Sequence, residues 1–453
     1  MRRSALHLIA GRPADLLERW REETDRSVRV TLLLTLGEAG AGAGAAEAPE
    51  DAEDAEGTTA AGIRAVLDGV VRGADPVLRV AAVVATASID PRAPLRAYAM
   101  LLELLTDPAL APQFEQVWYA PHSEYPYSRE DVAAWVVDLL GRDPEVALSF
   151  VAALAAAGRR TDDAELRRCA LDVGWRILVD RPSAADALLS LAAGLLADPD
   201  DDVRYKAAHL LAVLGRRSAP YADRLAGLLD DTGAAKFFDG TVGDHARWAL
   251  TRIGDPRALP DLVERLVAPY RDLQGWGYVL GDPRPPDVAD VLRPLAAHAG
   301  VLLPAVREAL RDEVARSGWL VRDLREVLRS WGQDPLLPGE TDPYPPPWEP
   351  PLMDPAEAEA AVLTYAADRE HLGSLYTALL SLAHHGHVTP PAREALTALR
   401  DANRRLTAYV DYRAFLQDEE IRTLIAAVLA LPSRVLQKTQ AGAFSLYGWG
   451  VAG

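Results

Sequence analysis

One stretch of the chain concentrates side chains that could form a binding or catalytic site. Residues 242–266, VGDHARWALTRIGDPRALPDLVERL, carry His245, Arg247 and Asp255 within a short span. Helix-boundary chemistry accounts for much of this stretch. Gly254 is typical of the residue that follows a helix, and an aspartate followed by proline is typical of the start of the next one. We therefore interpret the stretch as scaffolding and not as a site.

A second candidate is the cluster of His384, His385 and His387 around Gly386, because imidazoles are good metal ligands. The glycine suits a helix end, and histidines near a helix C-terminus meet the helix dipole favourably. We expect helix termination here and no metal site. The single cysteine, Cys169, lies in LRRCALDVG at a helical position and is expected to be a packing residue.

No constellation typical of a nucleophilic or cofactor-dependent enzyme occurs in the sequence. It contains no G-x-S-x-G motif, no H-E-x-x-H motif, no Walker loop and no Rossmann fingerprint. The sequence therefore predicts no catalytic residue, no metal and no cofactor. An enzyme whose site is assembled across several repeats stays open as an alternative.

The elements that must position these side chains follow a repeated frame. An aspartate stands four residues before an arginine, and a run of mostly apolar residues follows. Successive copies in the middle of the chain lie about 40 residues apart, which suits a two-helix repeat. The pairs are Asp25 with Arg29, Asp75 with Arg79, Asp163 with Arg167, and Asp200 with Arg204.

Helix chemistry explains this frame. The aspartate can cap a helix by accepting a backbone N–H. The arginine, one turn later, can reach its own or a neighbouring repeat's aspartate, so we expect a ladder of ion pairs along the stack. In the copy that contains Trp248, Gly243 stands in place of the aspartate, and Asp244 is expected to act as the cap.

The segment ARWALTRIGDPRALPDLVERL resembles the HEAT-like repeats of the phycobilisome-lyase type that occur in many bacterial proteins. The resemblance covers residues 1–333. It implies an all-α fold, an α-solenoid of HEAT-like helical pairs, without implying the lyase reaction. HEAT-type di-iron hydroxylases carry His-Glu pairs, and no His-Glu dipeptide occurs in this chain.

The resemblance also implies that the second helix of each pair lines the concave face of the solenoid. Aligning the frames places aromatic and charged residues in one row, two from each repeat and four residues apart. Aromatic residues and arginine are typical of protein interfaces. We expect a binding face there, with ordinary partly buried surface as the alternative. The row consists of Arg168 and Asp172, Tyr205 and His209, and Trp248 and Arg252.

Composition limits the partners. The chain of 453 residues has a formal net charge of -18, whereas nucleic-acid binding needs a basic stripe and an anionic membrane would repel the chain. No stretch is expected to approach the ~20 apolar residues of a membrane helix. One cysteine favours a cytoplasmic protein. We expect a protein or peptide partner, no nucleic acid and no membrane; the sequence does not indicate the oligomeric state.

Changes in composition predict the domain organisation. The solenoid should span residues 1–333, with a mobile Ala/Gly-rich and acidic insert at 38–60. A proline-rich linker follows at 334–353, then a smaller C-terminal helical domain at 354–432 that either stands apart or caps the last repeat, and a tail at 433–453.

The tail, with Phe444, Tyr447 and Trp449 among small residues, has no acidic or basic side chain after Lys438. It could dock on the folded part or stay disordered. It also resembles the core segments of ribosomally made, post-translationally modified peptides, which implies a carrier whose tail a modifying enzyme acts on. The favoured hypothesis is a non-catalytic protein- or peptide-binding scaffold. This carrier is one alternative, and a HEAT-like lyase or glycosylase is a disfavoured one.

Overall fold

Helices account for the regular structure of the protein. The computed structural model describes residues 12–43, 53–119, 125–235, 240–271, 285–340 and 351–431. Within these ranges there is no β-strand, and an isolated bridge joins Trp118 to Tyr127. The predicted all-α class is confirmed.

The chain divides into two compact units, residues 1–177 and residues 178–453. The division falls inside helix α10 (Ala164–Asp180), within the predicted solenoid. The second unit therefore contains both the later repeats and the C-terminal helices. Each unit is described by itself.

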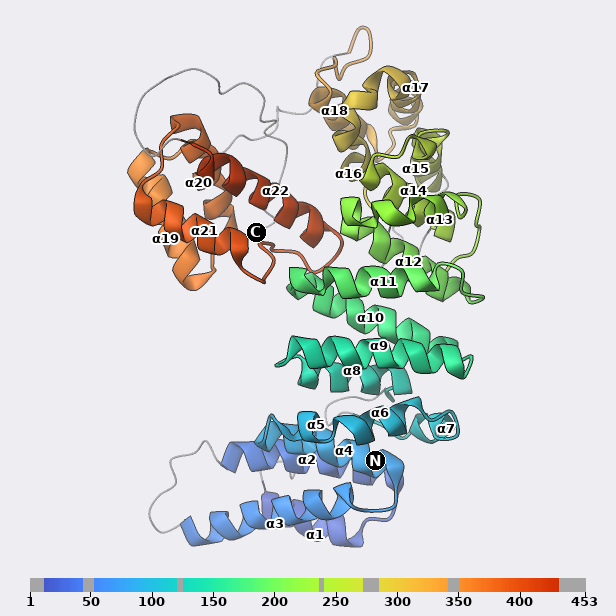
Figure 1. Cartoon of the computed structure of the whole chain (residues 1–453), viewed down its shortest axis with the longest axis vertical. Coiled ribbons are helices and arrows are strands. Elements are labelled where there is room, and N and C mark those ends of the chain that lie inside the picture. The colour runs from blue at the N-terminus through green and yellow to red at the C-terminus, as the bar shows by residue number, and fades with distance from the viewer. Residues whose placement is uncertain are drawn as a thin grey trace. The chain divides into compact units, whose positions relative to one another are not determined.

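Paired helices build the first unit, and helices α2 and α4 form its most extensive contact. Gly37 on α2 makes this approach possible, because a Cβ there would lie 2.3 Å from the carbonyl oxygen of Ala85 on α4. The helices of the unit are α1 (Pro13–Glu22), α2 (Arg26–Ala43), α3 (Glu53–Val71), α4 (Pro76–Ile89), α5 (Ala93–Arg96), α6 (Tyr98–Thr106), α7 (Ala111–Phe114), α8 (Arg129–Leu140), α9 (Pro144–Arg160) and most of α10 (Figure 1).

The aspartates of the repeated frame cap their helices as predicted. Asp75 accepts hydrogen bonds from the backbone N–H groups of Val77 and Leu78, and Asp200 accepts one from Val203. The carboxylates of Asp25 and Asp163 accept backbone N–H bonds from residues two or three positions later. Such caps satisfy donors that a helix start leaves without an intrahelical partner.

Within a frame the predicted aspartate–arginine pair does not form, because Arg79, Arg167 and Arg204 do not bond to the capping aspartate four residues before them. The frame arginines donate mainly to carbonyl groups where a neighbouring helix or turn ends. Arg79 donates to Val71 at 3.1 Å and Arg167 to Gly158 at 2.9 Å. Arg204 donates to Asp198 and forms ion pairs with Asp201 and Asp231, while its own capping aspartate pairs with the backbone instead. A guanidinium satisfies such terminal carbonyls and complements the helix dipole.

The second unit contains the later repeats and the C-terminal helices. Helices α11, α12 and α14 pack in sequence order. The elements are η2 (Pro182–Ala184), α11 (Ala185–Leu195), α12 (Asp201–Leu214), η3 (Gly215–Tyr221), α13 (Ala222–Ala226), α14 (Val242–Ile253), η4 (Pro256–Ala258), α15 (Leu262–Arg271), α16 (Val288–Leu292), η5 (Arg293–His298), α17 (Ala299–Arg316), α18 (Val321–Ser330), α19 (Pro355–Asp368), α20 (Leu372–His385), α21 (Pro390–Asp401) and α22 (Arg413–Leu429).

The start of α14 corrects one expectation. Thr241 is the N-cap, and Asp244 at the third helical position completes a capping box with it. Gly243 is needed for a different reason, since a Cβ there would lie 2.8 Å from the Leu229 carbonyl oxygen. The end of the helix is as predicted: Gly254 adopts the left-handed conformation (φ 84°), and Asp255 caps η4.

Helices α19 to α22 form a bundle with its own apolar core (Figure 1). Val362 of α19, Leu379 of α20, Leu396 of α21 and Ile425 of α22 are all fully buried in this core. The four helices lie within residues 354–432, the range in which the sequence predicts a smaller C-terminal helical domain.

The structure describes three predicted segments, the insert, the linker and the tail, to different extents. The insert at 38–60 is shorter than expected, because α2 continues to Ala43 and α3 begins at Glu53. The described parts of the linker at 334–353 contain no helix, and its residues 341–350 lie outside the described residues. The tail at 433–453, with Phe444, Tyr447 and Trp449, also lies outside them.

One stretch among the described residues, Val288–Arg316, is long and apolar enough to cross a membrane, with a mean hydropathy of 1.2. The expectation that no stretch approaches this limit is therefore wrong by length and composition. The stretch is not one straight helix, since it combines α16, η5 and α17, and Leu295 departs from helical dihedral angles. The core helix of a water-soluble protein meets the same criteria.

Candidate functional site

The predicted binding row is largely buried. Tyr205 and His209 on α12 and Trp248 on α14 are 0%, 1% and 2% exposed, so they do not form an open surface. That part of the prediction is wrong. The cause is packing: α12 and α14 lie against each other, and their aromatic residues fill the space between them.

The buried residues form an aromatic cluster with two histidines at its centre. The ring of His245 lies edge-on to Tyr205, with centroids 4.3 Å apart, and the Nδ1 atoms of His209 and His245 are 3.3 Å apart. One of these two nitrogens must donate and the other accept, so the pair fits two neutral rings of different tautomer. Burial lowers the pKa of His245 to about 3, and burial also lowers the pKa of His209.

The C-terminal bundle reaches this cluster through Tyr412, the residue before α22. Its ring lies edge-on to Trp248 with centroids 5.4 Å apart. Its hydroxyl donates to Asp290 Oδ2 at 2.8 Å and accepts the backbone N–H of Asp287 at 2.9 Å. Tyr412 is fully buried, and this burial together with the carboxylates raises the pKa of its hydroxyl.

Charged contacts extend the same interface. Arg252, the last residue of the predicted row, donates to Glu419 of α22 at 2.8 Å. Arg405, in the segment before α22, donates from Nε to the carbonyl of Leu178 at 3.0 Å, and its NH1 pairs with Asp418 at 3.1 Å. The repeat face on α12 and α14 is thus covered, at Trp248 and Arg252, by the protein's own C-terminal helices.

Several acidic side chains lie around the hydroxyl of Tyr412. Asp290 and Glu326 share Arg293, and Asp323 lies close to both acids. Burial, followed by the charges of its acidic neighbours, raises the pKa of Asp323 to about 6 although Arg322 opposes the shift. This cluster holds Tyr412 by hydrogen bonding, and no group of three or more potential metal ligands occurs among the described residues.

Arg168 and Asp172, the first members of the predicted row, lie on α10 in the first unit. Arg168 is half-buried and approaches Glu130 at 3.9 Å. Asp172 is also half-buried. The structure brings Tyr205, His209, Trp248 and Arg252 together in the second unit; these two residues belong to the other unit.

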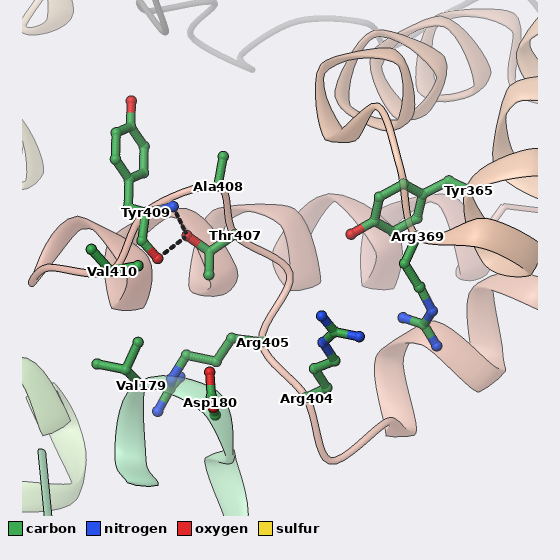
Figure 2. A pocket seen from close by; sticks show the side chains of 10 residues that line it. All are labelled: Val179, Asp180, Tyr365, Arg369, Arg404, Arg405, Thr407, Ala408, Tyr409 and Val410. Atoms are coloured by element: carbon green, nitrogen blue, oxygen red, sulfur yellow. Dashed lines mark hydrogen bonds between the residues drawn. The ribbon is translucent and has the colours of Figure 1, made fainter. Parts of the chain in front are cut away.

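A pocket of about 230 Å³ lies in the second unit beside the same interface (Figure 2). The end of α10, the end of α19 and the segment between α21 and α22 form its walls. Sequence reasoning missed it, because its arginines come from segments that no shared motif connects. The lining residues are Val179, Asp180, Tyr365, Arg369, Arg404, Arg405, Thr407, Ala408, Tyr409 and Val410.

The two remaining candidates lie at a helix end and inside a helix. Gly386 ends α20 in the left-handed conformation (φ 66°), and His385 Nε2 lies 2.9 Å from the carbonyl oxygen of Met353. Cys169 is buried in α10, where desolvation followed by nearby carboxylates raises the pKa of its thiol well above its usual range. A thiol held in this way is a poor nucleophile.

Residues 188–281 match the family described as HEAT repeats. No curated protein matches the chain. The matched region contains α11, α12 and α14, the helices that carry the aromatic cluster. The match covers residues 188–281 of the 453, and together with the paired helices it supports an all-α fold of the HEAT-like solenoid class, followed by a smaller C-terminal helical domain.

Proposed function

We propose that this protein is a non-catalytic scaffold that binds a protein or peptide at the α12–α14 face of its repeats. The observation that carries the proposal is the edge-on contact of the Tyr412 ring with the ring of Trp248. This face already accepts a side chain and a helix from another part of the chain. On its cysteine content alone, we also propose a cytoplasmic location.

The contacts of the C-terminal helix indicate what the face recognises. Tyr412 and Glu419 are seven residues apart, or about two helical turns, so they project from one side of a helix start. The aromatic ring meets Trp248 and the carboxylate meets Arg252. We infer a partner helix with an aromatic residue and an acidic residue two turns later, docked by its side chains in a groove.

The aromatic cluster of α12 and α14 also contains a hydrogen-bond donor for which the C-terminal helix supplies no acceptor. The indole Nε1 of Trp248 is buried and has no acceptor among the described residues. Leaving a buried donor without a partner costs about 1–3 kcal/mol. A partner that supplied an acceptor there would compete well with Tyr412, so the C-terminal bundle acts as an occupant that the partner displaces.

Release of the C-terminal helix tests this proposal. Tyr412→Ala removes the aromatic contact, and Glu419→Lys reverses the charge that faces Arg252. Tagged full-length protein is cross-linked in its native host, and partners and cross-link positions are identified by mass spectrometry. Both variants should capture more of the same partner than wild type, with cross-links on α12 and α14.

The matched control is Glu394→Lys, which makes the same charge change at an exposed position on α21. It should capture as much partner as wild type. Equal capture by all four proteins, or cross-links that avoid residues 201–214 and 242–253, would contradict the proposal. Intact folding of each variant is checked by its thermal unfolding midpoint.

A further inference from the structure

The pocket beside the C-terminal bundle has an unusual charge for this chain. Three arginines and one aspartate line it, whereas the whole chain carries a formal net charge of -18. Of the three, Arg405 is fully engaged: it donates to Leu178, pairs with Asp418, and lies 4.0 Å over the ring of Phe415. The other two arginines, Arg369 and Arg404, are less engaged.

Arg369 and Arg404 have no carboxylate partner among the described residues. The NH1 atom of Arg369 is buried and has no hydrogen-bond acceptor there either. Figure 2 shows both guanidinium groups below the Tyr365 ring. Burial raises the pKa of the Tyr365 hydroxyl, the two arginines oppose this shift, and Asp418 and Asp368 add to it. An orphaned buried donor costs free energy.

The backbone at Arg369 adds a second, independent observation. This residue follows α19 in the left-handed conformation, with φ 62° and ψ 19°. Glycine or asparagine usually holds this position after a helix, because a Cβ is disfavoured there. An arginine in a strained conformation with an unused donor is the pattern found where strain is kept for function.

We propose that Arg369 and Arg404, with the Tyr365 hydroxyl, form a binding site for the phosphoryl group of a small phosphorylated ligand. Guanidinium groups bind phosphate oxygens through paired, charge-assisted hydrogen bonds. The hydroxyl of Tyr365 has no hydrogen-bond partner among the described residues and can donate to a further oxygen.

The rest of the pocket suits an organic group attached to the phosphoryl group. Its volume of about 230 Å³ exceeds that of a bare oxyanion. Tyr409 lines the wall, and Val410 at the rim is 79% exposed. Asp180, the single lining carboxylate, opposes a second negative charge near the α10 side and favours an uncharged or cationic group there.

Isothermal titration of the full-length protein tests the proposal with three probes: inorganic phosphate, phenyl phosphate and benzoate. Ionic strength is matched with chloride. Phenyl phosphate should bind more tightly than phosphate, and both more tightly than benzoate. No heat from either phosphate probe at millimolar concentration would overturn the site, and benzoate binding as tightly as phenyl phosphate would overturn the phosphoryl class.

Two variants and one control complete the test. Arg404→Met, at an exposed position, should weaken phenyl phosphate binding about ten- to hundred-fold, as expected for a lost charge-assisted bond. Arg369→Gly should abolish binding and raise the thermal midpoint, because glycine relieves the left-handed backbone. The control, Arg400→Met, removes an exposed arginine that pairs with Asp401, and should bind like wild type.

A lower thermal midpoint in Arg369→Gly together with unchanged binding would show that this arginine is merely structural, and would overturn the proposal. The test is independent of partner capture at the α12–α14 face, since neither Arg369 nor Arg404 contacts Trp248 or Arg252. The two proposals can therefore fail separately.

Discussion

At the scale of single residues, the hydroxyl of Tyr412 bonds the C-terminal bundle to the start of α16. Tyr412→Phe removes the bonds to Asp290 and Asp287 while keeping the ring against Trp248. Because one of these bonds is charge-assisted and buried, the free energy of unfolding should fall by about 1–3 kcal/mol in urea titrations. The control Tyr365→Phe removes a hydroxyl without a described partner and should change it by less than about 0.5 kcal/mol. Equal effects would contradict the role of Tyr412.

The buried histidine pair predicts a pH dependence of stability. The unfolded chain binds protons at both histidines near pH 6.5, whereas the folded state keeps His245 neutral until about pH 3 and also resists protonation of His209. The unfolded state thus binds more protons between these values, and stability falls as the pH is lowered below 6.5. The slope should reach up to about 1.4 kcal/mol per pH unit for each histidine.

Asp323 titrates with the opposite sign, because its pKa is raised from 3.8 to about 6 and the folded state binds its proton more tightly. Comparison with a variant therefore isolates the histidines. His209→Leu should reduce the slope of unfolding free energy against pH between 5 and 6.5. Replacement of the exposed His384 by leucine should leave it unchanged. An unaltered slope in His209→Leu would show that the pair is not held neutral.

At the scale of the repeat element, the frame arginine and the capping aspartate act separately. Asp200→Ala should cost about 0.5–2 kcal/mol through the lost cap on Val203. Its effect should add to that of Arg204→Ala, because Arg204 does not bond to the Asp200 carboxylate. Arg204 and Asp231 are 16% and 17% exposed and hydrogen-bonded, so this pair should show coupling of about 1 kcal/mol or more in a double-mutant cycle. Strong coupling of Asp200 with Arg204 would contradict these connections.

Local chemistry made the helix boundaries predictable, whereas partners distant in sequence were not. Asp75, Asp200 and Gly254 act within a few residues of their own position, so their roles follow from residue type. The partners of the frame arginines do not follow from the sequence, because a long side chain can reach carbonyls as well as carboxylates, and the periodicity does not distinguish them. Trp248 was expected at a surface because no pattern in the sequence connects it with Tyr412.

At the scale of the whole molecule, the scaffold proposal makes a prediction about the tail. A scaffold needs no chemistry on Phe444, Tyr447 or Trp449, so protein from its native host should carry no mass shift located in residues 433–453. Intact mass spectrometry measures this directly. A mass shift located in residues 433–453, or loss of that segment, would favour the carrier hypothesis instead.

The C-terminal helices cover the α12–α14 face of the repeats at Trp248 and Arg252, and we expect them to do so in solution. Hydrogen–deuterium exchange with peptide-level mass spectrometry tests it most directly, by comparing wild type with Tyr412→Ala. Peptides from 242–253 and 288–292 should exchange faster in the variant, because Trp248 and the backbone of the Asp290 region lose their cover. Peptides from 76–89 in the first unit should exchange at the wild-type rate. Identical exchange of 242–253 in both proteins would contradict the account.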